Sequence, residues 1–321
     1  MNVEKYALTT QTYGVPFICT MKKYTRTKGR TNRVIDDESA PGSILLLANG
    51  SGFPKETWEA TISELYKIDT DRETRPIIRE IWALDCQSHG EAAILNEDVL
   101  VRHPGILTIW DYAEAFATLF RSGLLGKLDP KLHQVVLCGH SAGSIAVTLA
   151  TSFFNPPSRI PFAKIILVDP PIWSKNMEGL HTEMFKTTEA VTPVRRDIWE
   201  NMDHATQWLK KRLPGGSWDD RVFDAQTKYG LRTLPTAFYP DKTGVTLTTH
   251  RSCENSSFTG IKFIYNALDR LNQICAHIPV HLIYGGKHDM FTRELQDSIF
   301  NEQEGRTFAS VTRLSQDIGH L

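Results

Sequence analysis

Gln134-Val-Val-Leu-Cys-Gly-His-Ser-Ala-Gly143 is the stretch that decides the fold. Its residues from Val135 to Cys138 form a short apolar run, which is typical of a strand buried on both faces. A G-x-S-x-G pattern follows at Gly139-His140-Ser141-Ala142-Gly143, and apolar residues then recur at helical spacing through Phe153. A strand, a sharp turn and a helix in this order predict a nucleophile elbow with Ser141 at its tip.

The two glycines of the pattern have a steric purpose. At a turn this tight, side chains two residues before and two after the serine would collide with neighbouring backbone, so glycine is expected at positions 139 and 143. The same turn lets Ser141 adopt a strained conformation with its hydroxyl exposed. The following helix points its first amides and the positive end of its dipole toward that oxygen. The alternative is a chance glycine-serine turn without chemistry.

Composition limits the function classes. The chain has 321 residues, 41% of them hydrophobic, which is enough for one large domain or a core with an insertion. A net charge of -1 without long runs of one sign does not suggest a nucleic-acid partner. No apolar run approaches the roughly 18 residues of a membrane span. Five cysteines without framework spacing indicate reduced, mostly buried thiols.

Further short apolar runs predict the rest of a sheet. Repeated strand-helix units with buried strands imply the α/β class, with a mostly parallel sheet covered on both faces. Lys22 to Pro41 is polar and predicts a surface loop or hairpin. The other predicted strands lie in residues 3–20 (two strands), 44–48, 77–84, 165–168, 280–284 and 311–314.

The character of the sequence changes after the sixth predicted strand. Between about residues 172 and 257 apolar strand runs are missing and amphipathic helices broken by turns take their place. We therefore expect a helical lid at 172–257 inserted into an α/β core made of 1–171 and 258–321. Its apolar underside is expected to include Met184, Phe185, Trp199, Trp208 and Phe223.

Three residue types needed for acyl transfer follow predicted strands in the order Ser, Asp, His. They are Ser141, Asp289 and His320. Ser141 is inert at neutral pH without a base, so His320 is expected to accept its proton, and Asp289 to hold the imidazole tautomer. Asp169, after the preceding strand, is the alternative acid.

Two loops beside this site are also singled out. In the turn after residues 44–48, the backbone N–H of Ser51 is the expected oxyanion donor together with the N–H of Ala142; an ordinary strand-to-helix turn is the alternative. Asp85 and His89 follow the next strand, and we expect them to hydrogen-bond their own loop. The candidate substrate-lining residues are Phe53, His140, Trp199 and Trp208.

These motifs resemble the α/β-hydrolase superfamily over nearly the whole chain. Three segments, 50–56, 85–90 and 218–232, look more specifically like its fungal branch, which includes toxin-biosynthesis hydrolases and a yeast peroxisomal lipase. The sequence departs from many relatives in having Asn49 where they have His, which leaves a backbone oxyanion donor intact. It also stops one residue past His320, where relatives usually continue into a helix. The base is therefore either held less firmly or part of a shortened chain.

The resulting hypothesis is a serine hydrolase that cleaves an ester or thioester of a mostly apolar small molecule, with no cofactor and no metal. An acyltransferase, a lyase or a C–C hydrolase would keep the same residues, and a non-catalytic ligand receptor is the alternative from another class. The N-terminus lacks the apolar core of a secretory signal, so we expect a cytoplasmic or peroxisomal protein. Gly319-His320-Leu321 resembles a peroxisomal signal only weakly, and we expect it to serve catalysis instead. The oligomeric state stays open.

Overall fold

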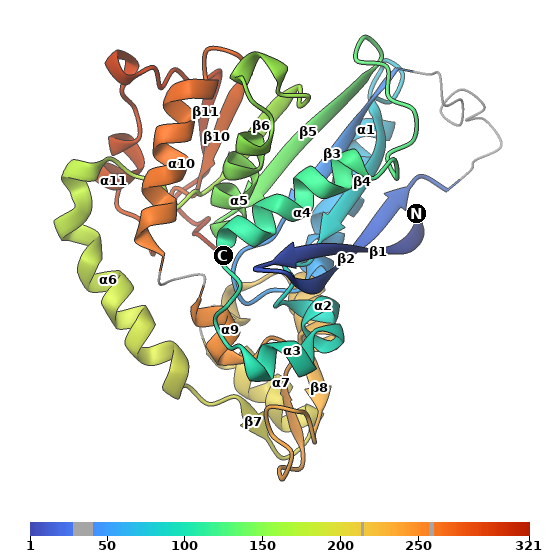
Figure 1. Cartoon of the computed structure of the whole chain (residues 1–321), viewed down its shortest axis with the longest axis vertical. Coiled ribbons are helices and arrows are strands. Elements are labelled where there is room, and N and C mark those ends of the chain that lie inside the picture. The colour runs from blue at the N-terminus through green and yellow to red at the C-terminus, as the bar shows by residue number, and fades with distance from the viewer. Residues whose placement is uncertain (28–40, 213–214, 257–259) are drawn as a thin grey trace.

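An eight-stranded, mostly parallel sheet forms the centre of the molecule (Figure 1). The computed structural model describes residues 1–27, 41–212, 215–256 and 260–321. All eight predicted strands are present, and they lie side by side in the order β1-β2-β4-β3-β5-β6-β10-β11. The strands are β1 (Asn2–Thr12), β2 (Val15–Thr25), β3 (Gly42–Ala48), β4 (Ile78–Leu84), β5 (His133–His140), β6 (Lys164–Val168), β10 (Val280–Tyr284) and β11 (Ser310–Arg313).

The direction of the strands places one edge of the sheet under the site. β2 pairs antiparallel with both β1 and β4, whereas all neighbouring pairs from β4 across the sheet to β11 are parallel. The carboxyl ends of the parallel strands therefore meet at one edge, which is where open α/β sheets bind ligands. The predicted loop from Lys22 to Pro41 is partly wrong, because β2 extends to Thr25 and Lys22 is buried. The rest of that loop falls largely on residues 28–40, outside the described residues.

Helices cover both faces of this sheet because its strands are apolar on both sides. Along β3, Ile44 and Leu46 pack with α4 (Ile109–Arg121), α5 (Ala142–Ala150) and α10 (Ile261–Ile274). Leu47 points the other way and packs against α1. The remaining helices of this part are short, namely η1 (Lys55–Trp58), α1 (Glu59–Thr70, the longest of them), α2 (Gly90–Leu95), α3 (Glu97–Arg102), η2 (Thr151–Phe153), η3 (Pro157–Arg159), α11 (Arg293–Ser298) and η7 (Glu302–Glu304).

The segment between β6 and α10 forms a cap below the sheet in the view of Figure 1. It was expected to be helical, but it also contains a three-stranded antiparallel sheet in the order β7-β9-β8. These strands have only two or three residues each, too few to give an alternating pattern in the sequence. The elements between β6 and α10 are η4 (Lys175–Met177), α6 (Glu178–Val191), η5 (Thr192–Val194), β7 (Ile198–Trp199), α7 (Met202–Lys210), η6 (Gly215–Ser217), α8 (Asp220–Gly230), β8 (Leu231–Thr233), β9 (Val245–Leu247) and α9 (Arg251–Asn255).

The first residues of the expected lid belong to the main core. Ile172, Trp173 and Met177 are buried in the same apolar cluster as the helices α4, α5 and α10. The cap has a small apolar cluster of its own, in which Trp199 and Leu231 pack with their neighbours. Three residues of the expected lid, up to Met177, therefore pack in the main apolar cluster.

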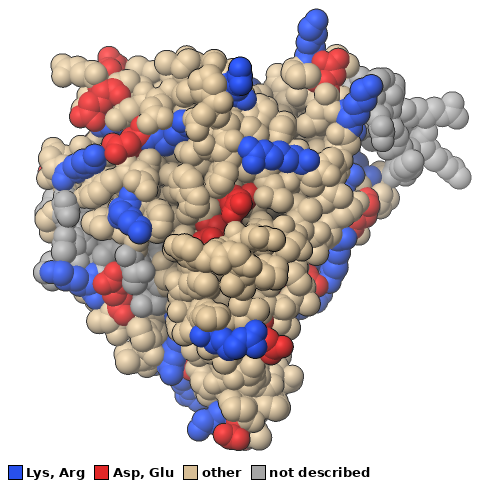
Figure 2. All heavy atoms as spheres, in the orientation of Figure 1, with Lys and Arg blue, Asp and Glu red and all other residues tan. Residues whose placement is uncertain are grey.

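Charges of both signs are scattered over the face drawn in Figure 2, and neither sign predominates there.

All five cysteines are unpaired and four of them are buried, which confirms the interpretation of their spacing. Within the described residues, no helix combines the length and the apolar character needed to cross a membrane.

Candidate functional site

Ser141 sits at the tip of a sharp turn between β5 and α5. Its φ of 52° lies in the region that few residues other than glycine adopt, so the backbone here is strained. The neighbouring chain passes so closely that a Cβ at Gly139 would lie 2.3 Å from the carbonyl oxygen of Gly143. A Cβ at Gly143 would lie 2.4 Å from the carbonyl oxygen of Ala48 on the adjacent strand. Only glycine fits at either position.

His320 and Asp169 complete a hydrogen-bonded chain with this serine. The ring nitrogen Nε2 of His320 lies 2.9 Å from Ser141 Oγ, and Nδ1 contacts Asp169 Oδ2. Since a carboxylate oxygen only accepts, Nδ1 carries the hydrogen and Nε2 is left to accept the serine proton. His320 and Asp169 are both buried, at 7% and 4% exposure. We call these three residues the Ser-His-Asp cluster.

The acid in this cluster differs from the one expected from the sequence. Asp289 was expected at the imidazole, but the structure places Asp169 there. Strand order gives the reason, because β6 lies directly beside the nucleophile strand β5 whereas β10 is one strand further away. Neighbouring strands are only about 4.8 Å apart, so a carboxylate directly after β6 reaches the ring without a loop. Asp169 follows the last residue of β6 immediately, with a φ of 43° that turns it toward the site.

Asp289 instead holds the backbone of His320. Its Oδ1 accepts the His320 backbone N–H at 3.0 Å, and the carbonyl oxygen of His320 accepts from Nε2 of His140 at 2.8 Å. The ring of Phe291 packs edge-on against the imidazole, with centroids 5.1 Å apart. Burial and, to a smaller extent, the nearby His320 lower the pKa of His140 to about 4, so His140 stays neutral. The base is thus held at its ring and at both of its backbone polar groups.

A cavity of about 390 Å³ opens beside the cluster, between the sheet edge and the cap. His140, His320 and Asp289 line it from the sheet side, and Phe53 from the loop after β3. Several further residues of the cap and of the loops line the cavity and were not predicted from the sequence. Some of them could have been proposed from the sequence, because they lie beside the glycine-rich turn or in the segment 218–232. The missed residues are Thr57, Trp58, Thr61, Ser217, Trp218, Asp219, Val222, Lys287, Asp317 and Ile318.

The other predicted lining residues lie elsewhere. Trp199 and Trp208 line a second cavity in the cap, with their ring centroids 5.4 Å apart. Phe223 lines that cavity as well, whereas the side chains of Met184 and Phe185 lie outside the described residues. Trp199 and Trp208 therefore line the second cavity and not the one beside Ser141.

The predicted oxyanion donors lie on the two elements that flank the serine. Ala142 opens α5, so its N–H has no carbonyl partner within the helix. Gly50 lies against the site, because a Cβ on it would stand 3.2 Å from Ser141 Cβ and 3.3 Å from His140 Nδ1. Ser51 lines the second cavity, and its hydroxyl donates to the carbonyl oxygen of Glu254 at 3.4 Å.

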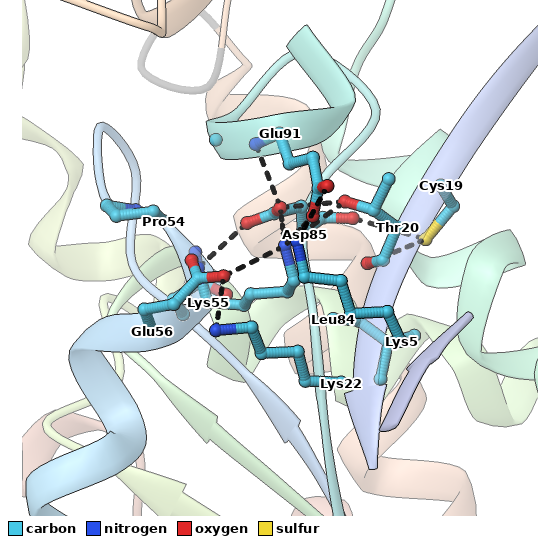
Figure 3. Close-up of polar contacts among 12 residues, drawn as sticks. Lys5, Cys19, Thr20, Lys22, Pro54, Lys55, Glu56, Leu84, Asp85 and Glu91 are labelled. Atoms are coloured by element: carbon cyan, nitrogen blue, oxygen red, sulfur yellow. Dashed lines mark hydrogen bonds and ion pairs between the residues drawn. The ribbon is translucent and has the colours of Figure 1, made fainter. Parts of the chain in front are cut away.

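A second polar cluster holds the loop that carries Gly50 and Ser51. Figure 3 shows Lys55 at its centre, surrounded by acidic groups from three segments of the chain. Its Nζ lies 2.7 Å from Asp85 Oδ2, 3.1 Å from Glu91 Oε2 and 3.2 Å from Glu56 Oε1. The side chain of Lys55 is fully buried, and the whole loop is thereby tied to the loop after β4. We call Lys55, Glu56, Asp85 and Glu91, together with Lys22, the Lys55 cluster.

Asp85 is the acceptor that connects the most partners in this cluster. Its carboxylate also accepts the backbone N–H of Lys55 at 2.8 Å, the hydroxyl of Thr20 at 2.8 Å and the N–H of Glu91 at 3.2 Å. Burial raises the pKa of Asp85 to about 6, although the Lys55 ammonium opposes this shift. Asp85 thus bonds its own loop and its neighbours, as expected.

His89 is enclosed in the same region. Its Nδ1 lies 3.0 Å from the hydroxyl of Ser88, and its Nε2 finds no hydrogen-bond partner in the described part of the chain. Burial lowers the pKa of His89 to about 4. The ring is 2% exposed and does not line the cavity beside Ser141.

Comparison with known proteins agrees with this architecture. A model of the alpha/beta hydrolase family matches residues 45–309, which is most of the chain. The chain belongs to the alpha/beta hydrolase family. Within this family, a type I acyl-CoA thioesterase of Penicillium roqueforti is 30% identical over 209 residues. That match covers 63% of this chain and 43% of the relative, so the chain spans less than half the length of the curated relative it matches.

Solved structures of other alpha/beta hydrolases share the fold at low sequence identity. A peroxisomal alpha/beta-hydrolase of Saccharomyces cerevisiae superposes with a TM-score of 0.73 at 15% identity, covering 99% of this chain and 83% of its own. An E-2-(acetamidomethylene)succinate hydrolase superposes with a TM-score of 0.65 at 12% identity, covering 99% and 92%. At these identities the likeness concerns the fold alone.

Proposed function

We propose that this alpha/beta hydrolase is a serine hydrolase that cleaves an ester or thioester of a mostly apolar acid through an acyl-enzyme. The observation that carries the proposal is the contact of 2.9 Å between Ser141 Oγ and His320 Nε2, with Asp169 at the other ring nitrogen. A weak nucleophile, a base within hydrogen-bond reach and a group that orients the base are the parts that covalent acyl transfer needs.

Each step of the reaction has a residue placed for it. His320 Nε2 takes the proton of Ser141 as Oγ attacks the carbonyl carbon, and the buried Asp169 carboxylate stabilises the imidazolium that forms. The backbone N–H groups of Ala142 and of Ser51 are our proposed donors to the oxyanion. The tetrahedral intermediate then collapses, and the imidazolium returns the proton to the leaving oxygen or sulfur. Water activated by the same imidazole hydrolyses the acyl-enzyme.

The walls of the cavity support an apolar acyl group. Phe53, Trp58, Trp218 and Val222 lie around the space that His320 opens onto, and such a lining favours hydrocarbon over strongly hydrated groups. A thioester is included because the curated relative from Penicillium roqueforti is named an acyl-CoA thioesterase. Thiols leave readily, so a thioester makes little demand on the acid that protonates the leaving group.

A fluorophosphonate probe tests the covalent mechanism directly. The probe phosphonylates a serine only when that serine is activated, so the wild-type protein should be labelled on Ser141 and Ser141→Ala should not. Esters and thioesters of short and medium acyl chains should then be turned over by the wild type. A protein that resists the probe and hydrolyses none of these substrates would be a non-catalytic member of the family.

We further propose that the cap forms a separable unit that determines substrate preference. Its own apolar cluster around Trp199 supports this, as does the contribution of Trp218 to the cavity. Replacing residues 178–256 by a short linker, while keeping Ile172, Trp173 and Met177, should leave a folded core with altered acyl-chain preference. A core that no longer unfolds cooperatively would show that the cap is part of the main folding unit.

The compartment remains part of the same proposal. Five unpaired cysteines fit a reducing environment, and we propose the cytoplasm or the peroxisome. Fractionation of cells that express the natural protein, with marker enzymes for each compartment, distinguishes the two. Recovery in a secreted fraction would contradict the proposal.

A further inference from the structure

The cap contains a second cavity, of about 480 Å³, next to the one beside Ser141. Phe53 and Trp218 line both cavities, and their rings meet edge-on with centroids 5.3 Å apart. The two cavities are therefore adjacent and share this ring pair as a common wall. Ser51 and Gly52, from the loop that approaches the nucleophile, form part of the same wall.

Two residues that line this second cavity each carry a buried polar atom without a hydrogen-bond partner among the described residues. The indole N–H of Trp199 and the side-chain oxygen of Gln226 make no hydrogen bond within the described part of the chain. Both residues line the cavity, and they are only 2% and 8% exposed. Buried donors and acceptors are seldom left unpaired in folded proteins, so a site that carries one of each is suited to a ligand with hydrogen-bonding groups.

The charges around the cavity favour an anion. Three arginines line it, Arg195, Arg196 and Arg212, against one carboxylate, Glu254. Arg195 is paired with Glu254 through Nη1 and Oε1 at 2.9 Å. Neither Arg196 nor Arg212 makes an ion pair among the described residues. Arg196 Nε donates to the carbonyl oxygen of Ile198, and the Arg212 guanidinium lies 4.4 Å from the Trp208 ring centroid.

The aromatic walls specify the shape of the partner. Trp199, Trp208, Trp218 and Phe223 together present flat apolar faces, on which a planar group stacks more favourably than a branched chain. We propose that the second cavity binds a planar anionic group at the far end of the ligand whose carbonyl reacts at Ser141. Arg196 and Arg212 neutralise its charge, and Trp199 and Gln226 hydrogen-bond to it.

This inference extends the proposed function, and the ligand chemistry has two sources. An acid with an aromatic carboxylate would place the planar anion on the acyl part, whereas a phosphorylated nucleotide would place it on the leaving thiol. Two probes represent these sources, naphthalene-2-carboxylate and adenosine 3′,5′-bisphosphate. Naphthalene-2-carboxamide and adenosine are their neutral counterparts, matched in shape.

Titration calorimetry of these four compounds tests the site without requiring turnover. The wild-type protein should bind at least one anion more tightly than its neutral counterpart. Trp199→Phe, which keeps an aromatic ring but removes the N–H, and the double variant Arg196→Gln/Arg212→Gln should each weaken that binding about tenfold or more. Arg293→Gln, an exposed arginine on α11 that lines neither cavity, is the matched control and should bind as the wild type does.

The results identify the source of the planar anion, and they test this inference separately from the proposed function. The anion that binds identifies the source, the carboxylate pointing to the acyl part and the bisphosphate to the leaving group. If neither anion binds at millimolar concentration, or if both cavity variants bind as tightly as Arg293→Gln, the inference is wrong. Fluorophosphonate labelling of Ser141 is unaffected by either result, so a labelled serine with no anion binding would overturn only this inference.

Discussion

The loop from Asn49 to Glu56 separates two polar clusters that are built in opposite ways. On its cavity side, His320 of the Ser-His-Asp cluster lines a space of about 390 Å³, and Ser141 beside it is partly exposed. On its other side, the Lys55 cluster is closed, and the ammonium of Lys55 contacts only protein groups at zero exposure. One cluster keeps a reactive oxygen accessible, whereas the other satisfies its central charge completely.

The two clusters differ because the Ser-His-Asp cluster is proposed to carry out the reaction, whereas the Lys55 cluster holds a loop in position. A nucleophile needs an accessible oxygen and a base that can change its protonation state during the reaction. In a cluster that only holds a loop in position, every buried charge needs an opposite charge, because an incomplete buried ion pair leaves a charge without compensation. Variants on the cavity side should therefore reduce turnover with little effect on stability, and variants on the closed side should reduce stability first.

The largest effect is expected at the nucleophile. Ser141→Ala removes the attacking oxygen, and we expect turnover to fall by about 10⁴ to 10⁶ because only binding and the oxyanion donors remain. The free energy of unfolding should stay close to that of the wild type, since Ser141 is partly exposed. The turnover rate on an ester that the wild type hydrolyses, together with urea unfolding, measures both. Comparable turnover by the variant would eliminate the acyl-enzyme.

The next effect distinguishes the two aspartates around His320. Asp169→Asn removes the carboxylate at Nδ1, disturbs the tautomer and should lower kcat by about 10⁴, as in a related cluster of the same composition. Asp289→Asn keeps an oxygen that can accept the backbone N–H of His320, so we expect a loss of less than about tenfold. Parallel kcat measurements on the two variants decide between them. A larger loss in Asp289→Asn would assign the orienting role to the acid after β10.

On the closed side, Lys55→Met should be the most destabilising change. It leaves Asp85 and Glu56 buried without their shared cation, and breaking a buried pair in this way costs about 3–5 kcal/mol. Lys67→Met is the matched control, because Lys67 is exposed and its pair with Glu64 at 3.9 Å contributes at most about 1 kcal/mol. Urea unfolding of both variants gives the two free energies. Equal losses would mean that the Lys55 cluster does not support the fold.

The smallest effect concerns pH. His89 has a pKa of about 4 in the folded protein and about 6.5 when unfolded, so the unfolded chain binds the proton first as the pH falls. The neutral His89 ring therefore contributes stability above pH 6.5, and this contribution is lost as the pH falls toward 4. Between pH 7 and pH 5, the free energy of unfolding should fall by about 2 kcal/mol for this reason.

Urea unfolding at the two pH values tests this assignment. His89→Gln should lose less stability on acidification than the wild type, and His103→Gln, at an exposed position, should lose as much as the wild type does. If His89→Gln is as acid-sensitive as the wild type, the ring is not responsible for the loss.

The parts of this site that follow from short stretches of sequence were predictable. The elbow is one such part, because the strand, the two glycines and the helix all lie within twenty residues of Ser141. The eight strands of the sheet are another, because each buried strand shows as an apolar run. His320 could be proposed from its place after the last strand.

The acid could not be decided in the same way. Asp169 and Asp289 both follow strands, and the choice between them depends on which strand lies next to β5, which is a property of the whole sheet. A more local signal was present, since Asp169 directly follows its strand and Asp289 stands five residues beyond Tyr284. The burial of Lys22 was also hidden, because a lysine in a strand gives no indication that acidic partners from η1 and α1 will enclose it.

The separation of the serine and its base along the chain has a consequence for biosynthesis. Ser141 and His320 are 179 positions apart, so the ribosome makes the nucleophile long before it makes the residue that activates it. At about 5–20 residues per second, this interval lasts roughly ten seconds or more. During that time the elbow can fold on its strand and helix while its hydroxyl stays as unreactive as that of any other serine. Under the proposed mechanism, the newly made protein therefore becomes reactive only when residues 318–321 have docked against Asp169, Asp289 and His140.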